Sequence, residues 1–289
     1  MTTRQAGEII HLSHAKIKQP TDFFNSQSGR KEVIAMAIAI ETANKVIPIG
    51  PSWKPNPLNE IIYSLNPLGL IGPLASIVMG APSGNGAPVL LVPGAMGTPL
   101  HPQYQRMDWW LWAIGYNPRP CKVGLNIGCL DDLTQLVIQG IDEAVAATGL
   151  QAHVFGHSLG AAIGRAAAKR RPKKVATVVS IAGTVQGAMV IPPVYGAAQR
   201  AMPKECQNGC SCWFRQSLQQ DMPPDVARFA LYAGNDGVME WEGCLEEAGG
   251  ESIKVRWGAN HLNIVTHLES CLQIARFLAT HPAKKIAIA

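Results

Sequence analysis

Charged side chains and long apolar runs are both scarce in this chain. Asp, Glu, Lys and Arg together make up 16% of its 289 residues, and the formal net charge is +5. No dense stripe of Lys and Arg is visible, so nucleic-acid binding is not expected. No apolar run approaches the roughly 20 residues of a membrane-spanning helix. The first residues (MTTRQAGEIIHLSHAKIK) contain no apolar segment typical of a secretion signal. We therefore expect a cytoplasmic protein without a transmembrane segment.

Cysteine occurs in an odd number, which does not favour a disulfide framework. Of the seven cysteines, only Cys206, Cys210 and Cys212 form a cluster. Their spacing matches no common zinc pattern, and no second ligand pair lies nearby in the sequence. Without an export signal, reduced thiols are expected, with a disulfide involving this cluster as the alternative. We expect no metal site.

Alternating strands and helices dominate the chain from about residue 87 onward. Apolar residues account for 47% of the whole sequence, enough for one large α/β domain with a sizeable core. Strands are predicted over 88–92, 117–121, 151–155, 174–181, 227–233 and 251–256, and helices over 101–115, 131–148, 159–171 and 262–280. Strands separated by helices favour a mostly parallel central sheet with helices on its flanks.

Two segments do not follow this alternation. Residues 1–86 are predicted to form a helical and Pro/Gly-rich extension packed on the catalytic domain, 87–289, with a helix over 31–45. Within the extension, the apolar residues 65–81 are interrupted by Pro and Gly. They either wrap over the core or form a flap over a site or a membrane-facing surface. Residues 183–224 interrupt the sheet pattern, and we expect them to form a short cap insertion.

One pentapeptide carries a chemical signal, Gly156-His157-Ser158-Leu159-Gly160. It follows a predicted strand and precedes an Ala-rich helix, which is the context of a nucleophile elbow. In such a turn the serine hydroxyl projects from the end of the sheet. The two glycines are needed because a Cβ at either position would collide with a neighbouring strand or helix. The pattern predicts Ser158 as a nucleophile.

A serine hydroxyl needs a base, and the base needs a partner that holds its tautomer. In this strand–helix architecture the chain order is serine, acid, histidine. Asp236 follows the strand predicted over 227–233, in the turn Gly-Asn-Asp-Gly, and is the preferred acid. Glu240 and Glu242 are the alternatives.

The chain offers several histidines for the role of base. His261 follows the last predicted strand and is preferred, whereas His267 is expected inside the final helix. Beside the nucleophile, His157 is expected to pack or to line the substrate pocket. His153 is expected to be structural, and His101 is a candidate to border the pocket.

Two backbone N–H groups must meet the negative charge that develops on the attacked carbonyl oxygen. One is the amide of Leu159, the residue after the nucleophile. The other comes from the loop after the first core strand, where Pro93 has no N–H and Gly94 allows a sharp turn. Ala95 is therefore the predicted second donor. Met96 is the runner-up and also a candidate to contact substrate.

The segments PVLLVPGAMG, VFGHSLGAAIGR, ALYAGNDGVMEW and ANHLNI, in this order, resemble the bacterial lipase/esterase-like branch of the α/β-hydrolase superfamily. The resemblance covers residues 87–280 and also includes Gly115-Tyr116, Asn126-Ile127-Gly128 and Cys244. It implies an α/β-hydrolase fold, a triad of Ser158, Asp236 and His261, and oxyanion donors Ala95 and Leu159. The sequence departs from many relatives at Pro93, where a histidine commonly precedes the glycine.

Together these features predict a serine hydrolase that cleaves carboxylic esters through an acyl-enzyme, with no cofactor. The apolar segments 65–81 and 183–198 favour a lipid-like substrate with an apolar acyl chain, and transient contact with a membrane surface. The same residues would serve an acyltransferase, a thioesterase, an amidase or a lactonase. A binding protein without activity is disfavoured by the intact triad.

Overall fold

The computed structural model describes residues 60, 66–185, 200, 204, 213–218 and 220–287. All of them belong to one unit, Val46–Ala289. The helix predicted over 31–45, the cysteine cluster and most of the predicted cap lie outside the described residues. The predicted division of the chain at residue 86 stays a prediction.

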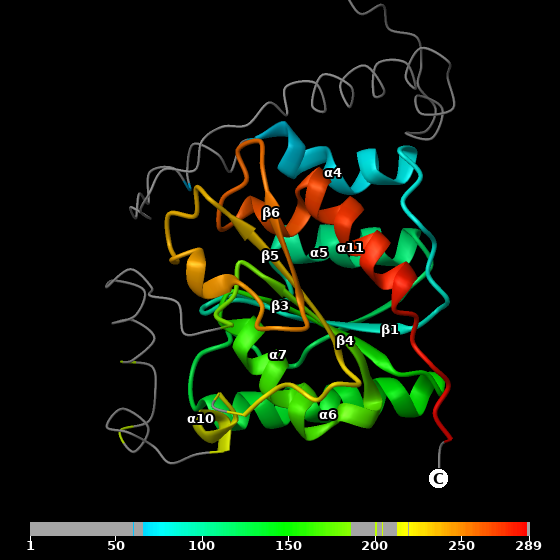
Figure 1. Ribbon diagram of the computed structural model, residues 1–289, viewed down its shortest axis with the longest axis vertical. Coiled ribbons are helices and arrows are strands. Elements are labelled where there is room, and N and C mark those ends of the chain that lie inside the picture. Colours follow the sequence, from blue (N-terminus) through cyan, green and yellow to red (C-terminus); the bar gives the residue numbers. More distant parts are fainter. Residues whose placement is uncertain are drawn as a thin grey trace, which may run out of the picture. The chain divides into compact units, whose positions relative to one another are not determined.

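An all-parallel sheet forms the centre of the fold (Figure 1), with the strand order β2-β1-β3-β4-β5-β6. Its strands are β1 (Pro88–Val92), β2 (Asn117–Pro120), β3 (Ala152–His157), β4 (Val175–Ile181), β5 (Ala227–Ala233) and β6 (Glu251–Val255). The predicted fold class, a parallel sheet flanked by helices, is confirmed. The weakest strand, β2, contains two prolines, which an edge strand tolerates because one side needs no ladder hydrogen bonds.

Helices cover both faces of the sheet. Figure 1 shows α4 (Pro67–Val78), α5 (Pro102–Ala113) and α11 (Leu268–Thr280) on one face, and α6 (Leu130–Thr148), α7 (Leu159–Arg170) and α10 (Trp213–Ser217) on the other. Three short 3-10 helices complete the described elements: η1 (Pro172–Lys174), η2 (Glu242–Cys244) and η3 (Asn263–Thr266). No described helix is long and apolar enough to cross a membrane.

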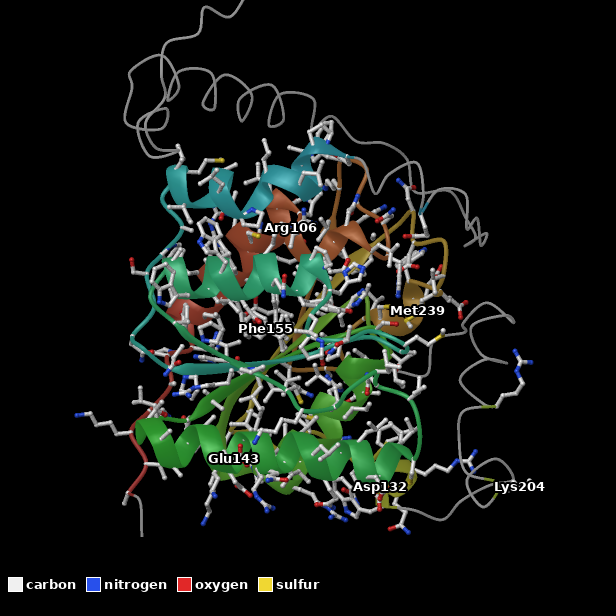
Figure 2. All side chains as sticks on the ribbon, turned by 180° about the vertical axis from the view of Figure 1, so that it is seen from behind. Arg106, Asp132, Glu143, Phe155, Lys204 and Met239 are labelled. Atoms are coloured by element: carbon white, nitrogen blue, oxygen red, sulfur yellow. The ribbon has the colours of Figure 1, made fainter. Side chains whose placement is uncertain are left out.

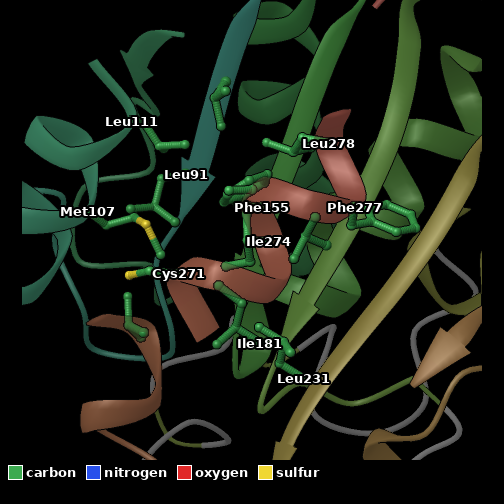
Figure 3. Packing of buried hydrophobic residues seen from close by; sticks show 14 of the residues in the cluster. Leu91, Met107, Leu111, Phe155, Ile181, Leu231, Cys271, Ile274, Phe277 and Leu278 are labelled. Atoms are coloured by element: carbon green, nitrogen blue, oxygen red, sulfur yellow. The ribbon is translucent and has the colours of Figure 1, made fainter. Parts of the chain in front are cut away.

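Two apolar clusters fill the spaces between the sheet and its helices. On the α5 and α11 side, Figure 3 shows Phe155 of β3 and Ile181 of β4 packed against Ile274 and Phe277 of α11. On the α6 and α7 side, a second cluster joins the other faces of the same strands to these helices. Figure 2 places Phe155 between the two layers of helices. Strands buried on both faces explain the nearly continuous apolar runs in the sequence.

Residues 67–78 form helix α4 despite two prolines and two glycines. Pro67 occupies the first turn, where its missing N–H costs nothing. Pro73 cannot donate to the carbonyl oxygen of Gly69, but that oxygen accepts a 2.7 Å hydrogen bond from Thr266 Oγ1. A Cβ on Gly72 would lie 2.2 Å from the carbonyl oxygen of Thr266. The glycines therefore allow α4 to pack closely on η3 and α11.

The helix predicted over 262–280 is divided in the structure. Residues Asn263–Thr266 form η3, and α11 begins at Leu268. His267 is not inside the helix as predicted: it is the N-cap, and its Nδ1 accepts a hydrogen bond from Glu269 N at 3.3 Å. The apolar spacing of the two helical pieces is continuous in the sequence, which hid the break.

Candidate active site

The predicted elbow is formed by β3, Ser158 and α7. Ser158 has φ 53° and ψ −124°, a conformation that residues with a Cβ rarely adopt. A Cβ on Gly156 would lie 2.3 Å from Ala161 Cα, and one on Gly160 would lie 2.2 Å from the carbonyl oxygen of Val92. Both distances are far below contact, so the tight strand-to-helix turn requires glycine on either side of the serine.

The elbow lies beside the switch point of the sheet, where β2 is added on one side of β1 and β3 on the other. The chain leaves β1 toward β2 on one side and returns to place β3 on the other. At such a switch point, open α/β proteins bind ligands outside the carboxyl ends of the strands, beside the loops that follow the two central strands. Here these loops are the one after β1, which begins at Pro93, and the elbow. A Cβ on Gly94 would lie 3.0 Å from Ser158 Cβ, so the two loops are in contact.

The predicted acid and base form a buried pair at the same edge. His261 Nδ1 donates a 2.8 Å hydrogen bond to Asp236 Oδ2, and the two side chains are 5% and 1% exposed. The other carboxylate oxygen, Oδ1, accepts from Val238 N at 2.9 Å and Met239 N at 2.8 Å. The loop after β5 thus fixes the carboxylate, and the carboxylate fixes the imidazole.

This pairing sets the chemistry of His261. A carboxylate only accepts hydrogen bonds, so Nδ1 carries a proton and neutral His261 presents a lone pair at Nε2. Burial alone would lower the pKa of His261, but the charge and hydrogen bond of Asp236, together with the charge of Glu60, raise it above the ordinary value of 6.5. The ring is therefore a stronger base than a free histidine.

The loop after β1 contains Ala95, the predicted oxyanion donor from that side, and the runner-up Met96. Gly97 N donates to the carbonyl oxygen of Gly94 at 2.9 Å, which closes a tight turn around Ala95 and Met96, and Met96 has a φ of 59°. Fully buried Asn126 supports the turn, because its Nδ2 donates to the carbonyl oxygen of Pro93 at 2.5 Å.

Across from this turn, Leu159 is the first residue of α7. An N–H in the first turn of a helix has no acceptor within the helix and lies at the positive end of the helix dipole. That amide is available to an anionic oxygen above Ser158. The two predicted donors, Ala95 and Leu159, thus come from loops that touch each other.

A buried chain of hydrogen bonds links the loop after β1 (the oxyanion loop, 93–97) to the loop after β6 that carries His261 (the base loop). Gly94 N donates to Tyr104 Oη at 3.0 Å, and Tyr104 Oη lies 2.7 Å from His157 Nδ1. His157 Nε2 lies 2.8 Å from the carbonyl oxygen of His261. Because the carbonyl can only accept, Nε2 carries the proton, and Nδ1 accepts the proton of Tyr104.

The protonation of this chain is fixed by burial. Burial, with His261 nearby, lowers the pKa of His157 to about 3, and burial raises the pKa of Tyr104. His157 is therefore neutral and Tyr104 keeps its hydroxyl proton. Both ring nitrogens of His157 are occupied by protein groups, so this residue packs inside the site, one of the two roles expected from the sequence.

Sequence reasoning missed Glu60, which is 5% exposed and lies behind the base loop. Its Oε1 accepts from Gly237 N at 2.7 Å and from His261 N at 3.2 Å, and its Oε2 accepts from Leu262 N at 3.2 Å. Asn66, the N-cap of α4, also reaches this loop and donates to the carbonyl oxygen of Trp257 at 2.7 Å. No local pattern in the sequence marks either residue.

The remaining candidates lie as follows. His101 is exposed at the N-cap of α5, with its ring centroid 6.0 Å from that of Tyr104. His153 is fully buried in the sheet layer, with Nδ1 2.8 Å from Thr177 Oγ1. Cys244 is a free, buried thiol that donates to Met239 Sδ at 3.6 Å. Within the described ranges, no three His, Cys, Asp or Glu side chains gather as a metal site would require.

The sequence matches no protein-family model and no curated protein. Several solved structures resemble the fold. A mouse α/β-hydrolase domain-containing protein 10 is 14% identical with a TM-score of 0.49, covering 68% of this chain and 92% of its own. Tomato methylketone synthase I is 13% identical, with a TM-score of 0.48 and coverage of 68% and 98%. A Paleococcus ferrophilus monoacylglycerol lipase is 13% identical, with a TM-score of 0.47 and coverage of 69% and 96%. The likeness is one of fold.

Proposed function

We propose that this protein is a serine hydrolase that cleaves carboxylic esters, with Ser158 as nucleophile, His261 as base and Asp236 as its partner. One observation carries the proposal: a buried His261–Asp236 pair, joined at 2.8 Å, lies at the same sheet edge as a strained elbow serine. Asp236 and the elbow belong to strands β5 and β3, which share the parallel sheet, so their loops leave from one edge.

The first half of the reaction forms an acyl-enzyme. Ser158 Oγ attacks the ester carbonyl carbon while its proton passes to His261 Nε2, and the imidazolium is stabilised by Asp236. The negative charge on the former carbonyl oxygen is met by the amides of Leu159 and Ala95. When the tetrahedral intermediate collapses, the carbon–oxygen bond to the alcohol breaks, and the proton on Nε2 goes to the leaving oxygen.

The second half regenerates the enzyme. A water molecule gives one proton to His261 Nε2 and adds its oxygen to the acyl carbon. Collapse of this second intermediate breaks the bond to Ser158 Oγ, which takes the proton back from Nε2. The carboxylic acid leaves. Every proton moves between the substrate, water and these two side chains.

The surroundings of the site favour an apolar acyl chain. Several large apolar side chains on the loops after β1, β2 and β6 are exposed: Met96 at 62%, Leu125 at 57%, Ile127 at 41% and Leu262 at 40%. Leu262 follows the base directly, and Leu125 and Ile127 flank Asn126, which holds the oxyanion loop. Large apolar groups exposed together around a polar centre are typical of a surface that binds an apolar ligand.

The decisive experiment is covalent labelling. A fluorophosphonate should add to the wild-type protein in a one-to-one ratio by intact mass, with the label on Ser158 by peptide mapping. Ser158→Ala should not be labelled, and Ser180→Ala, in which a buried serine of β4 is changed, should be labelled as the wild type is. Labelling elsewhere, or none in the folded wild type, would refute a serine nucleophile at this position.

The substrate class is tested with a panel of p-nitrophenyl esters of rising acyl length and one aryl amide. We expect ester turnover that rises from acetate toward medium chains, and little turnover of the amide. A steady fall with chain length would contradict the apolar acyl site. Faster turnover of the amide than of its matched ester would instead support an amidase.

A further inference from the structure

The loops that carry Asp236 and His261 are joined by a side chain from a distant part of the chain. Glu60 is 177 residues from Gly237 and 201 residues from His261, yet its Oε1 accepts hydrogen bonds from both backbone amides. Its own carbonyl oxygen accepts from Asn260 Nδ2 at 3.1 Å. The residue is therefore held by the base loop through its backbone and its side chain.

The hydrogen-bond donors around Glu60 bear on the ionisation of its carboxyl group. Three N–H groups point at its two carboxylate oxygens, an arrangement that suits the ionised acceptor-only form. The pKa of Glu60 is raised above its ordinary value of 4.5 because burial outweighs the hydrogen bond from Gly237 and the charge of His261, which lower it. Asp236, whose charge raises the same pKa, shares this environment.

We propose that Glu60 is a positioning residue. It ties the loop after β5 that carries Asp236 (the acid loop) to the base loop, and it adds a second negative charge behind the imidazole of His261. This inference rests on the proposed function for its kinetic consequences. Glu60 binds the main chain of residues 237, 261 and 262 and acts through His261 rather than on substrate. The arrangement makes the chain before the first strand a part of the site's scaffold.

The neighbouring contacts explain why this position is rigid. Asn66 accepts from Leu68 N at 2.9 Å and donates to Trp257 O, so the start of α4 is fastened to the base loop as well. Asn260 and Asn263 bond each other reciprocally, with Asn263 N to Asn260 Oδ1 at 2.8 Å and Asn260 N to Asn263 Oδ1 at 2.9 Å. Within this frame, Glu60 is the group that also reaches the acid loop.

The charged and titratable groups facing His261 come from three elements. Asp236, in the loop after β5, raises the pKa of His261, and so does Glu60. His157, from the elbow, lies beside His261 and stays neutral. Removing the Glu60 charge removes one of the three causes that favour the imidazolium, beside the charge and the hydrogen bond of Asp236. The pKa of His261 then falls, and the acidic limb of the rate profile moves to lower pH, because the neutral base persists further into acid.

The test compares Glu60→Gln, Glu60→Asp and the control Glu269→Gln. In glutamine, Oε1 still accepts from Gly237 and His261, but an NH₂ group faces the N–H of Leu262. Glu269 also accepts a backbone amide of the base-side segment, Arg256 N at 2.8 Å, and is not among the groups that shift His261. For Glu60→Gln we expect kcat to fall roughly 10-fold or more with KM within about twofold, since small misplacement of a catalytic group costs up to about 100-fold.

The pH profile of kcat/KM separates positioning from general loss of stability. In Glu60→Gln the acidic limb should move to lower pH, whereas Glu60→Asp, which keeps the charge, should lower kcat and leave the limb near its wild-type position. Glu269→Gln should leave the limb unchanged. An unshifted limb and unchanged kcat in Glu60→Gln would overturn the proposal.

A second readout does not depend on turnover. The ring Cε1 resonance of His261, assigned by its loss in His261→Gln, should titrate at lower pH in Glu60→Gln than in the wild type. If the wild type hydrolyses no ester while this shift is present, the proposed function fails and the role of Glu60 toward His261 stands. If the wild type is active and neither readout moves, the function stands and the role of Glu60 fails.

Discussion

His157 Nε2 donates a 2.8 Å hydrogen bond to the main-chain carbonyl oxygen of His261. The residue beside the elbow serine thereby holds the backbone of the proposed base, and the centroid of its ring lies 5.0 Å from that of the His261 ring. Through Tyr104, the same ring is connected to the oxyanion loop at Gly94. One buried chain of polar groups thus connects the elbow next to Ser158, the backbone of His261 and the loop after β1.

Removing the hydroxyl of Tyr104 should break this chain. Tyr104→Phe leaves Gly94 N and His157 Nδ1 without their partner, which costs about 1–3 kcal/mol of stability for each buried group left unpaired. We expect kcat to fall because the oxyanion loop is no longer held, with little change in labelling of Ser158 by a fluorophosphonate. The measurements are thermal unfolding and steady-state kinetics.

Tyr116→Phe is the matched control for that variant. Tyr116 is buried, and the centroid of its ring lies 5.6 Å from that of the His153 ring, away from the oxyanion loop. We expect its kcat to stay within about twofold of the wild type. Equal losses of kcat in the two variants would show that Tyr104 has no particular link to catalysis.

The dependence of rate on pH should report the pairing of His261 with Asp236. The pKa of His261 is raised above 6.5, and neutral His261 is the base, so kcat/KM should rise with pH with a midpoint above 6.5. Asp236→Asn removes the charge, which lowers the pKa and moves the midpoint to lower pH. The amide also disfavours the reactive tautomer, so kcat should fall by about 10⁴-fold. A rate profile that keeps its midpoint in Asp236→Asn would contradict the assignment.

The elbow should not tolerate a methyl group at its second glycine. Gly160→Ala places a Cβ 2.2 Å from the carbonyl oxygen of Val92, and neither backbone can yield without moving Ser158. We expect loss of labelling at Ser158 or failure to fold, measured by fluorophosphonate labelling and circular dichroism. The control is Gly164→Ala in the next turn of α7, where a Cβ meets a side-chain methyl, Val154 Cγ1 at 2.9 Å, rather than a backbone atom, so a loss of stability without displacement of Ser158 is expected.

A buried ion pair between α7 and the segment after η2 should matter for stability rather than for chemistry. Arg165 Nη1 lies 2.5 Å from Glu246 Oε1, with side chains 5% and 0% exposed. Arg165→Met removes the cation that faces a buried carboxylate and should cost roughly 3–5 kcal/mol in denaturant unfolding. Adding Glu246→Met should restore much of that loss.

The surface offers a control for the ion pair. Lys122 Nζ lies 2.9 Å from Glu143 Oε2, with side chains 69% and 48% exposed. Figure 2 shows Glu143 on α6. Lys122→Met should destabilise the protein far less than Arg165→Met does, because water and salt screen exposed charges. Similar losses for the two Met variants would mean that burial does not set the value of the Arg165–Glu246 pair.

The elbow was predictable because its constraints are local. Ser158 with its two glycines, placed between a strand and a helix, admits few other interpretations, and the structure gives a steric reason for each glycine. The pairing of Asp236 with His261 followed from strand order, since loops after parallel strands leave from one edge. Their role in catalysis stays a prediction until it is measured.

The supports behind the site were not predictable from the chain alone. Glu60 and Asn66 meet the base loop from residues about 200 positions away, and no periodicity or motif signals such a contact. Helix α4 was hidden by its own glycines and prolines, which usually interrupt helices. Only the packing on η3, where Thr266 bonds the carbonyl that Pro73 leaves open, makes those residues suitable.

The backbone of Ser158 has a consequence for engineering. At φ 53° a serine is strained by about 1–3 kcal/mol, and glycine would relieve that strain. A library screened for heat resistance alone would therefore enrich glycine at this position and discard the nucleophile. Directed evolution of this protein should couple every thermal challenge to an activity readout. At this residue, selection for stability favours glycine, whereas selection for activity favours serine.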